Sequence, residues 1–285
     1  MENKFFESPT MHVSDITIQV ANLQRSLDFY HTFLGFQVME ETENQAILSA
    51  DGKKALIILE QPEGVLPKQG KTTGLYHFAI LLPQRADLAA FLKHLLQAGK
   101  AYSLQLGAAD HIVSEALYFS DPDGNGIEVA RDRLSKSWKW IDESVQMSTN
   151  PLDADGLLAE AAGDWQGMPV ETRIGHVHLH VNDLLAAKEF YIKGIGFQEV
   201  TGFPGASFLS DNGYHHHIAI NTWNGEGAPI PDLQAAGMQF FTITYPNKEE
   251  IDKVVQRLAA LGYPADEGMV KDPAGNHIFL TVAAK

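Results

Sequence analysis

Two similar segments give the first indication of chemistry in this chain. The segment DPDGNGIEV, residues 121–129, occurs again as DPAGNHIFL, residues 272–280, but Phe279 stands where the first copy has the carboxylate of Glu128. A carboxylate on an apolar strand is costly to bury unless it has a partner. For Glu128 we expect that partner to be a metal ion.

The composition limits the ligands that such a metal could have. The chain has no cysteine and twelve histidines, which excludes disulfides, cysteine nucleophiles and thiolate zinc sites and leaves nitrogen and oxygen ligands. The net charge of −15 argues against nucleic acid or an anionic membrane as a partner. The sequence has no stretch typical of a signal peptide or a membrane span. We therefore expect a cytoplasmic protein, and a homo-oligomer stays open.

The elements that must position these residues form four copies of one unit. Each copy begins with alternating apolar residues, as a strand does, and continues with a capping residue and a helix of about a dozen residues. Short strands joined by tight turns complete it, so the predicted order is β-α-β-β-β. The copies span about 14–61, 75–131, 175–223 and 239–282.

The four units group into two repeats with a linker between them. We place the first repeat at 10–132, the linker at 133–172 and the second repeat at 173–284. The linker is rich in acidic and small residues and has no strand alternation, which predicts a surface connection with one or two short helices.

The repeated unit resembles the vicinal oxygen chelate superfamily of glyoxalases, bleomycin resistance proteins and extradiol dioxygenases. The tags VANLQRSLDFYHTFLGF and VNDLLAAKEFYIKGIGF are similar to its opening strand and helix, and DPDGNGIEV is similar to its closing strand. The resemblance implies an α+β fold in which paired units curl into half-open, mixed β-barrels around a metal. Four units match the size of the extradiol dioxygenases, and the sequence is similar to those of the catechol 2,3-dioxygenase type. Because one fold serves several functions, the site residues must decide between them.

The metal ligands of this superfamily come from the first or last strand of a unit. We aligned the units on the residues that begin each helix, which are Asn22, Gln84, Asp183 and Asn247. The first-strand positions that this alignment makes equivalent are Asp15, His77, His176 and Phe240, and the last strands offer Glu128 and Phe279. The middle units thus supply His77, His176 and Glu128, the two-histidine, one-carboxylate set of non-haem Fe(II) oxygenases. We expect units two and three to pair around Fe(II), or alternatively Mn(II), and units one and four to form a metal-free barrel.

The resemblance also implies an acid–base residue in the run Tyr214-His215-His216-His217. The family register points to His216 as the residue that handles a catechol proton, a task for which an imidazole with a pKa near neutrality is suited. Strand alternation would turn His215 and His217 the other way. The alternative is a solvated histidine patch.

Two further residues match positions that the family uses for substrate. Tyr118 precedes Glu128 by the family's spacing for an active-site tyrosine, although an ordinary core tyrosine is the alternative. His111 lies near the place of another substrate-contacting histidine, but its spacing is not identical, so its role stays open.

The remaining ligand-type residues are not expected to bind the metal. His178 and His180 share a strand face with His176 but lie too far along it for all three to bind one ion, so we expect them to line the barrel. Asp15 is expected to be the remnant of a ligand position, hydrogen-bonded or solvated. We expect no function for His12 and surface positions for two helical histidines, His31 and His94.

The resemblance thus implies an Fe(II)-dependent extradiol dioxygenase that opens a catechol with O2, using His216, Tyr118 and His111 beside the metal. One alternative is a hydroquinone-cleaving dioxygenase with the same ligands. A glyoxalase-type isomerase or thiol transferase is another, although such enzymes often use more carboxylates. A metal-independent binding or resistance module is the third.

Overall fold

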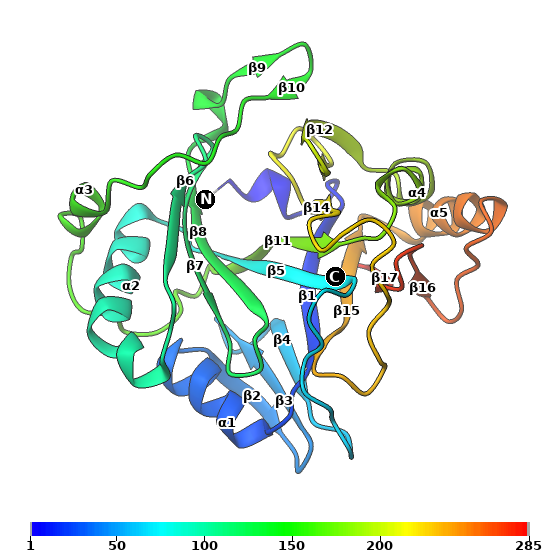
Figure 1. Ribbon diagram of the computed structural model, residues 1–285. Helices are drawn as coiled ribbons and strands as arrows, with labels where there is room; N and C mark the ends of the chain where they lie inside the picture. Colours follow the sequence, from blue (N-terminus) through cyan, green and yellow to red (C-terminus); the bar gives the residue numbers. More distant parts are fainter. Residues whose placement is uncertain (1, 284–285) are drawn as a thin grey trace.

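The computed structural model describes residues 2–283, so the predicted end of the second repeat, residue 284, lies outside the described part. Two curled sheets form the framework, and the helices lie on their outer sides (Figure 1). Strands of units two and three form one sheet of eight strands, and strands of units one and four form one of seven. This confirms the α+β fold and the predicted pairing of the units.

The eight-stranded sheet has the order β12-β13-β14-β11-β5-β8-β7-β6. Unit two contributes β5 (Gly74–Leu81), β6 (Gly107–Asp110), β7 (Ser114–Ser120) and β8 (Gly126–Asp132). Unit three contributes β11 (Arg173–His180), β12 (Gln198–Phe203), β13 (Ala206–Ser210) and β14 (Ile218–Asn221). The two units join where β5 runs antiparallel to β11 at the centre of the sheet.

The seven-stranded sheet repeats this arrangement in the order β16-β17-β15-β1-β4-β3-β2. Unit one contributes β1 (His12–Gln19), β2 (Gln37–Glu41), β3 (Gln45–Ser49) and β4 (Ala55–Glu60). Unit four contributes β15 (Gly237–Tyr245), β16 (Met269–Lys271) and β17 (His277–Val282). Unit four therefore has one strand fewer than the repeat predicts. Its connection at 261–268, LGYPADEG, lacks apolar alternation and contains proline and glycine, which do not favour a strand.

Each unit places one helix after its first strand. These helices are α1 (Leu23–Leu27), α2 (Arg85–Ala98), α4 (Leu184–Glu189) and α5 (Lys248–Ala260). In units one and three the helix continues as a π-helical turn, η2 (Asp28–Phe33) and η5 (Phe190–Ile195). A 3-10 turn, η3 (Gly99–Tyr102), extends α2. Side chains of Asn22, Asp183 and Asn247 accept hydrogen bonds from the first turns, as capping residues do.

The strand alternation decides which side chains form the main core. Ile16 and Ile18 of β1 and Val177 and Leu179 of β11 are buried in one apolar cluster with the helices, where β1 packs against β11. Side chains at alternate positions of a strand point to opposite faces. The histidines of β11 therefore lie on the other face of the sheet, inside its curl.

A second, smaller apolar cluster lies within the eight-stranded sheet. It joins strand residues such as Ala219 to Tyr214, to Trp138 of the linker and to Phe5 and Phe6 of the N-terminal segment. Phe5 belongs to a short 3-10 turn, η1 (Asn3–Phe5). Segments far apart in sequence thus pack together inside this sheet.

The two repeated turns noted in the sequence act as anchors between the sheets. Asp121 accepts hydrogen bonds from the backbone amides of Asp123 and Asn125, and the hydroxyl of Tyr30 donates to it over 2.9 Å. Asp272 accepts an equivalent bond of 2.9 Å from Tyr191. The helix of unit one therefore holds a turn of the eight-stranded sheet, and the helix of unit three holds a turn of the seven-stranded sheet. The shared aspartate of the two segments is explained by turn geometry, whereas Glu128 is not.

The linker contains more regular structure than expected. The predicted short helices are present as η4 (Ser135–Ser137) and α3 (Ala154–Leu158). Between them β9 (Trp140–Ile141) and β10 (Ser144–Val145) form a hairpin that projects from the sheets in Figure 1. Asp142 and Glu143 in its turn both have positive φ. Two-residue strands are too short to show an alternation, so the sequence pattern did not predict this hairpin.

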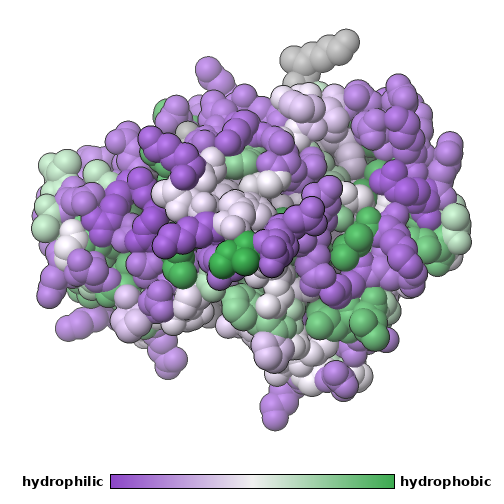
Figure 2. All heavy atoms as spheres, turned by 90° about the horizontal axis from the view of Figure 1, so that it is seen from above, coloured by the Kyte–Doolittle hydropathy of each residue, from purple (hydrophilic) through white to green (hydrophobic). Residues whose placement is uncertain are grey.

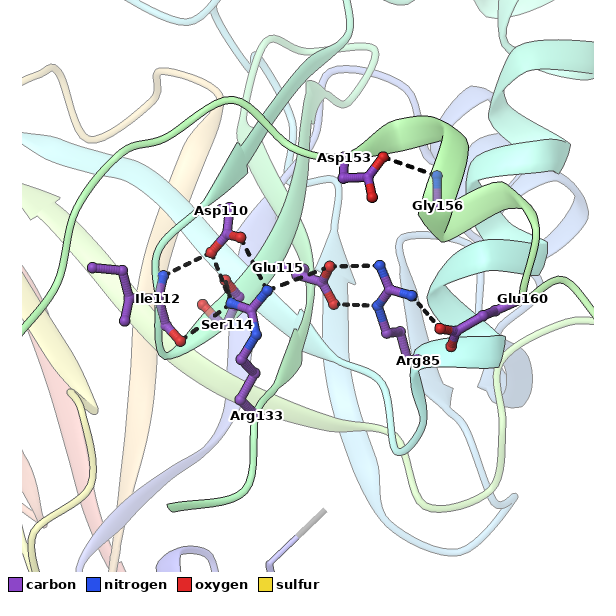
Figure 3. Close-up of polar contacts among 9 residues, drawn as sticks. All are labelled: Arg85, Asp110, Ile112, Ser114, Glu115, Arg133, Asp153, Gly156 and Glu160. Carbon is purple, nitrogen blue, oxygen red and sulfur yellow. Dashed lines mark hydrogen bonds and ion pairs between the residues drawn. The ribbon is translucent and has the colours of Figure 1, made fainter. Parts of the chain in front are cut away.

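An ion-pair cluster connects the linker to unit two (Figure 3). The buried carboxylate of Glu115 on β7 accepts two hydrogen bonds, of 2.7 and 2.9 Å, from the guanidinium of Arg85. Arg85 also pairs with Glu160, which follows α3. Arg133 lies 3.6 Å from Glu115 and donates to Asp110. The cluster fixes the outer edge of the sheet next to His111.

The face shown in Figure 2 is mostly hydrophilic, and its apolar side chains are scattered. Among residues 2–283 no helix is long and apolar enough to cross a membrane.

Candidate metal centre and active site

Three buried ligand-type side chains converge inside the eight-stranded sheet. His77 comes from β5, Glu128 from β8 and His176 from β11. The Nε2 atoms of the two histidines are 3.2 Å apart. Oε2 of Glu128 lies 3.1 Å from Nε2 of His77 and 3.2 Å from Nε2 of His176. The structure thus brings the three predicted ligands together, while their binding of a metal stays a prediction.

The strand register explains this convergence. Ala79 on β5 pairs with Glu128 on one side and with His176 on the other, so these three positions form a row across the sheet. His77 lies two residues from Ala79 on the same face. The small side chain of Ala79 leaves room between its neighbours. Next to His77, a Cβ on Gly126 would lie 2.1 Å from the carbonyl oxygen of Tyr76, so only glycine allows β8 this close to β5.

The geometry of the three donor atoms fits a metal ion. Two ligands at right angles with bonds of about 2.1 Å are separated by about 3 Å. The observed separations of 3.1 and 3.2 Å are close to this length. Each pair of donors therefore corresponds to one edge of a single coordination face.

The electrostatics also favour metal binding. Burial lowers the pKa of His77, which favours the neutral imidazole that metals require. Burial alone would raise the pKa of Glu128, but the neighbouring His176 and His77 hold it well below its ordinary value. The site therefore offers a carboxylate and a neutral imidazole before any metal enters.

His216 lies directly beside this cluster. Its ring centroid is 4.1 Å from that of His176, and the Phe208 ring packs edge-on against it at 5.0 Å. Burial lowers the pKa of His216 well below its ordinary value. The family register therefore pointed to a histidine that is buried and adjacent to the cluster, and its catalytic role stays a prediction. A solvated patch is excluded, because His215, His216 and His217 are all buried.

The predicted alternation within this histidine run is only partly correct. The run precedes β14 and has no regular strand geometry. His217 does turn away and contacts the carbonyl oxygen of Phe5 at 2.9 Å. His215 stays close to His216, with their Nδ1 atoms 2.9 Å apart. Outside a regular strand, sequence spacing does not fix side-chain direction.

Tyr118 and His111 form a hydrogen-bonded pair at the edge of the cluster. The Tyr118 ring lies 5.6 Å from the His77 ring, and Tyr118 pairs with Glu128 across β7 and β8. Its hydroxyl is 2.6 Å from Nε2 of His111, whose Nδ1 is 2.7 Å from the carbonyl oxygen of Ser148. A carbonyl oxygen only accepts, so Nδ1 of His111 carries a proton, and in a neutral imidazole Nε2 then accepts the hydrogen bond from Tyr118. The structure thus places His111 next to Tyr118 despite its inexact spacing.

A family model described as the glyoxalase/bleomycin resistance protein/dioxygenase superfamily matches residues 12–129 and 173–283. The chain belongs to this superfamily. The superfamily's catechol-2,3-dioxygenase from Bacillus subtilis (strain 168) is 45% identical to it over 271 residues, which cover 92% of this chain and 94% of that relative.

More distant relatives agree with this assignment. Biphenyl-2,3-diol 1,2-dioxygenase 3 of Rhodococcus globerulus is 29% identical over 163 residues, covering 53% of this chain and 82% of that relative. The solved structure of glyoxalase I from Zea mays has a TM-score of 0.55 at 16% identity and covers 95% of this chain and 92% of that chain, a likeness of fold alone. The identity to the Bacillus subtilis relative makes this superfamily member an enzyme of the dioxygenase branch.

Asn221 at the end of β14 lies beside His178 and His180 and was not predicted from the sequence. Its amide nitrogen donates to Nε2 of His178, and its oxygen lies 2.8 Å from Nδ1 of His180. The expectation that both histidines line the barrel agrees with their contacts with the ring of Tyr76. Asn221 had no sequence signal, because an asparagine at a strand end is usually read as a turn residue.

A cavity of about 540 Å³ lies beside the cluster and is lined by one of the three predicted ligands, His77. Tyr118 also lines it, and so do the segments 68–76, 230–233, 235–239 and 275–277. Its polar and apolar groups are mixed, and its charged groups include Lys68, Lys71 and Asp232. A volume of this size is typical of a small-molecule site.

The seven-stranded sheet keeps the register but not the ligands. Asp15 pairs with Thr242, and Thr242 pairs with Phe279, as His176, Ala79 and Glu128 do in the other sheet. Asp15 accepts hydrogen bonds from Thr242 and Ser14, of 2.6 and 2.7 Å. Burial raises the pKa of Asp15. It is hydrogen-bonded, as expected for the remnant of a ligand position.

Three further histidines for which the sequence analysis expected no role in the site are His12, His31 and His94. Nδ1 of His12 contacts the carbonyl oxygen of Thr10, and His31 is exposed. His94 is partly buried and packs against Phe33, so the expected surface position was only partly correct. An amphipathic helix buries residues at its flanks as well as on its central stripe.

Proposed function

We propose that this enzyme is an Fe(II)-dependent extradiol dioxygenase that opens the ring of a catechol with O2. The observation that carries the proposal is the buried face of two imidazole nitrogens and one carboxylate oxygen, with the ring of the acid–base candidate His216 in contact with that of His176. This donor set is typical of non-haem Fe(II) oxygenases. The names of the dioxygenase relatives support the substrate class.

In this proposal His77, His176 and Glu128 hold the iron. Three donors on one face of an octahedron leave up to three positions for other ligands. When bound, the ferrous ion would hold both reactants side by side and supply the electron transfer that activates O2. Mn(II) prefers similar ligands and is the alternative metal.

His216 is the residue that we assign to proton transfer. Because burial lowers its pKa, it is neutral before substrate enters. A neutral imidazole can take a proton from one hydroxyl of the catechol and return it to the product later. The neighbouring Phe208 keeps water from one side of this ring.

Tyr118 and His111 are assigned to orienting the substrate. Burial raises the pKa of Tyr118 well above its ordinary value, so it stays a neutral phenol. Its hydroxyl donates a hydrogen bond to His111, so the lone pairs of the phenolic oxygen can accept a hydrogen bond from a substrate hydroxyl. The cavity beside Tyr118 could admit an aromatic diol.

The proposal is tested by loading the metal-free enzyme with Fe(II) or Mn(II) without air and then measuring oxygen uptake with catechols and with hydroquinone. We expect uptake with catechols and a ring-opened product. His216→Ala should keep the bound metal and lower kcat by roughly 10²- to 10⁴-fold, the usual contribution of acid–base catalysis. Uptake with hydroquinone alone would favour the alternative dioxygenase. A tightly metallated enzyme that is inactive on both would exclude ring cleavage of either kind.

A further inference from the structure

A hydrogen-bonded chain extends from His216 away from the metal cluster. Nδ1 of His216 is 2.9 Å from Nδ1 of His215, and Nε2 of His215 is 2.9 Å from Oδ1 of Asp132. The hydroxyl of Tyr214 donates to the other oxygen, Oδ2, of Asp132 over 2.8 Å. Both histidines are buried, and the Asp132 side chain is 13% exposed.

The rings of this chain are held by packing on both sides. The His215 ring lies 4.1 Å from that of Tyr214 and 5.2 Å from that of Trp138. Trp138 is fixed in turn by a hydrogen bond from its Nε1 to the carbonyl oxygen of Arg133. His215 therefore has little freedom to rotate away from His216.

The chemistry of the partners fixes which nitrogens carry protons. A carboxylate only accepts, so His215 donates to Asp132 through a protonated Nε2. In a neutral imidazole the other nitrogen then accepts, so Nδ1 of His215 receives its hydrogen bond from the protonated Nδ1 of His216. His216 is thereby left with an unprotonated Nε2.

We propose that Asp132 is a positioning residue which, through His215, fixes His216 in the tautomer whose free Nε2 can accept the substrate proton. This inference rests on the proposed role of His216. It assigns to Asp132 no contact with substrate or metal. The Tyr214 hydroxyl completes the array by fixing the orientation of the Asp132 carboxylate.

The topology makes this array part of the same junction as the metal cluster. Asp132 follows Glu128 by four positions (132 − 128) on one strand, β8, so the two side chains lie on one face. The histidines of the array come from unit three, as His176 does. The pairing of units two and three thus assembles both the ligands and the group that orients the base.

The decisive variant is Asp132→Asn. The Tyr214 hydroxyl would donate to the amide oxygen, so the amide nitrogen would face His215 and donate to its Nε2. His215 would then carry its proton on Nδ1 and donate to His216, whose proton would move to Nε2. We expect kcat to fall by at least about 10²-fold with KM nearly unchanged, because a base in the wrong tautomer cannot accept the proton.

The matched control is Asp142→Asn in the exposed turn of the β9–β10 hairpin, where asparagine tolerates the positive φ equally well. We expect wild-type kcat and KM for this variant. A second variant, His215→Phe, keeps an aromatic ring between Tyr214 and Trp138 while removing the hydrogen bond to His216. It should lower kcat with a retained fold, and it replaces the first test if Asp132→Asn does not fold.

A spectroscopic measurement separates this inference from the proposed function. Nitrogen-15 NMR of zinc-loaded and metal-free protein, labelled at histidine, reports the tautomer of His216 without turnover. We expect protonated Nδ1 in the wild type and protonated Nε2 in Asp132→Asn. An unchanged tautomer, or an unchanged kcat beside a changed tautomer, would overturn the positioning role. If the wild-type enzyme fails to cleave catechols while the tautomer of His216 changes as expected in Asp132→Asn, the proposed function is wrong. The control of the His216 tautomer by Asp132 is then still supported.

Discussion

Glu128 and Phe279 occupy the same position in the two sheets. Glu128 pairs with Ala79 across parallel strands β8 and β5, and Phe279 pairs with Thr242 across parallel strands β17 and β15. The carboxylate of Glu128 therefore faces two histidines, whereas the ring centroid of Phe279 lies 6.4 Å from that of Phe240. The same backbone serves chemistry in one sheet and packing in the other.

The three proposed ligands should be individually necessary for metal binding. We expect His77→Ala, His176→Ala and Glu128→Ala to lose tight Fe(II) binding, because two remaining donors cannot form the face that holds the ion. Metal content after anaerobic loading and desalting measures this. His31→Ala, an exposed helical histidine, is the control and should bind as the wild type does. Stoichiometric iron in any of the three variants would contradict the assignment.

His111 and Tyr118 should act as a unit. Because their side chains share a hydrogen bond of 2.6 Å, removing either partner should disturb the other. We expect His111→Ala and Tyr118→Phe each to lower kcat/KM, and the double variant to lose less than the product of the two effects. A double-mutant cycle on catechol measures a coupling on the order of 1 kcal/mol. Fully independent effects would mean that His111 does not act through Tyr118.

The Glu115 carboxylate should matter for stability and little for chemistry. Glu115→Ala would leave Arg85 and Arg133 facing each other at a partly buried site. We expect a loss of roughly 2–3 kcal/mol, somewhat below the usual loss for a broken buried pair because both arginines reach solvent. The shift of the urea midpoint measures it. The exposed pair Lys248–Asp252 is the control, and Asp252→Ala should cost less than about 0.5 kcal/mol.

The seven-stranded sheet should accept a second metal site. Phe240→His with Phe279→Glu would place an imidazole and a carboxylate at the positions equivalent to His77 and Glu128, next to Asp15. Made in a His176→Ala background, this double variant should bind Co²⁺, with the visible absorption of a coordinated ion. Phe240→Leu with Phe279→Leu in the same background is the control and should not bind. Equal behaviour of the two variants would contradict the equivalence of these positions.

The sequence by itself determined the repeat, the pairing of its units and the three residues that converge. A strand ladder makes this possible, because its fixed period of two carries sequence register into spatial register, so that the positions of His77, His176 and Glu128 followed from alignment. The shortened fourth unit and the linker hairpin fell outside this reasoning, since neither has an apolar period to detect.

Only the tertiary structure decided how the groups around the cluster are connected. Asp132 and His215 lie far apart in sequence and belong to different units, and Asn221 reaches two histidines from the end of another strand. The direction of His215 depends on an irregular segment and on packing between Tyr214 and Trp138. Side-chain hydrogen bonds across a unit boundary have no sequence period, so they become visible only when the two units are placed side by side.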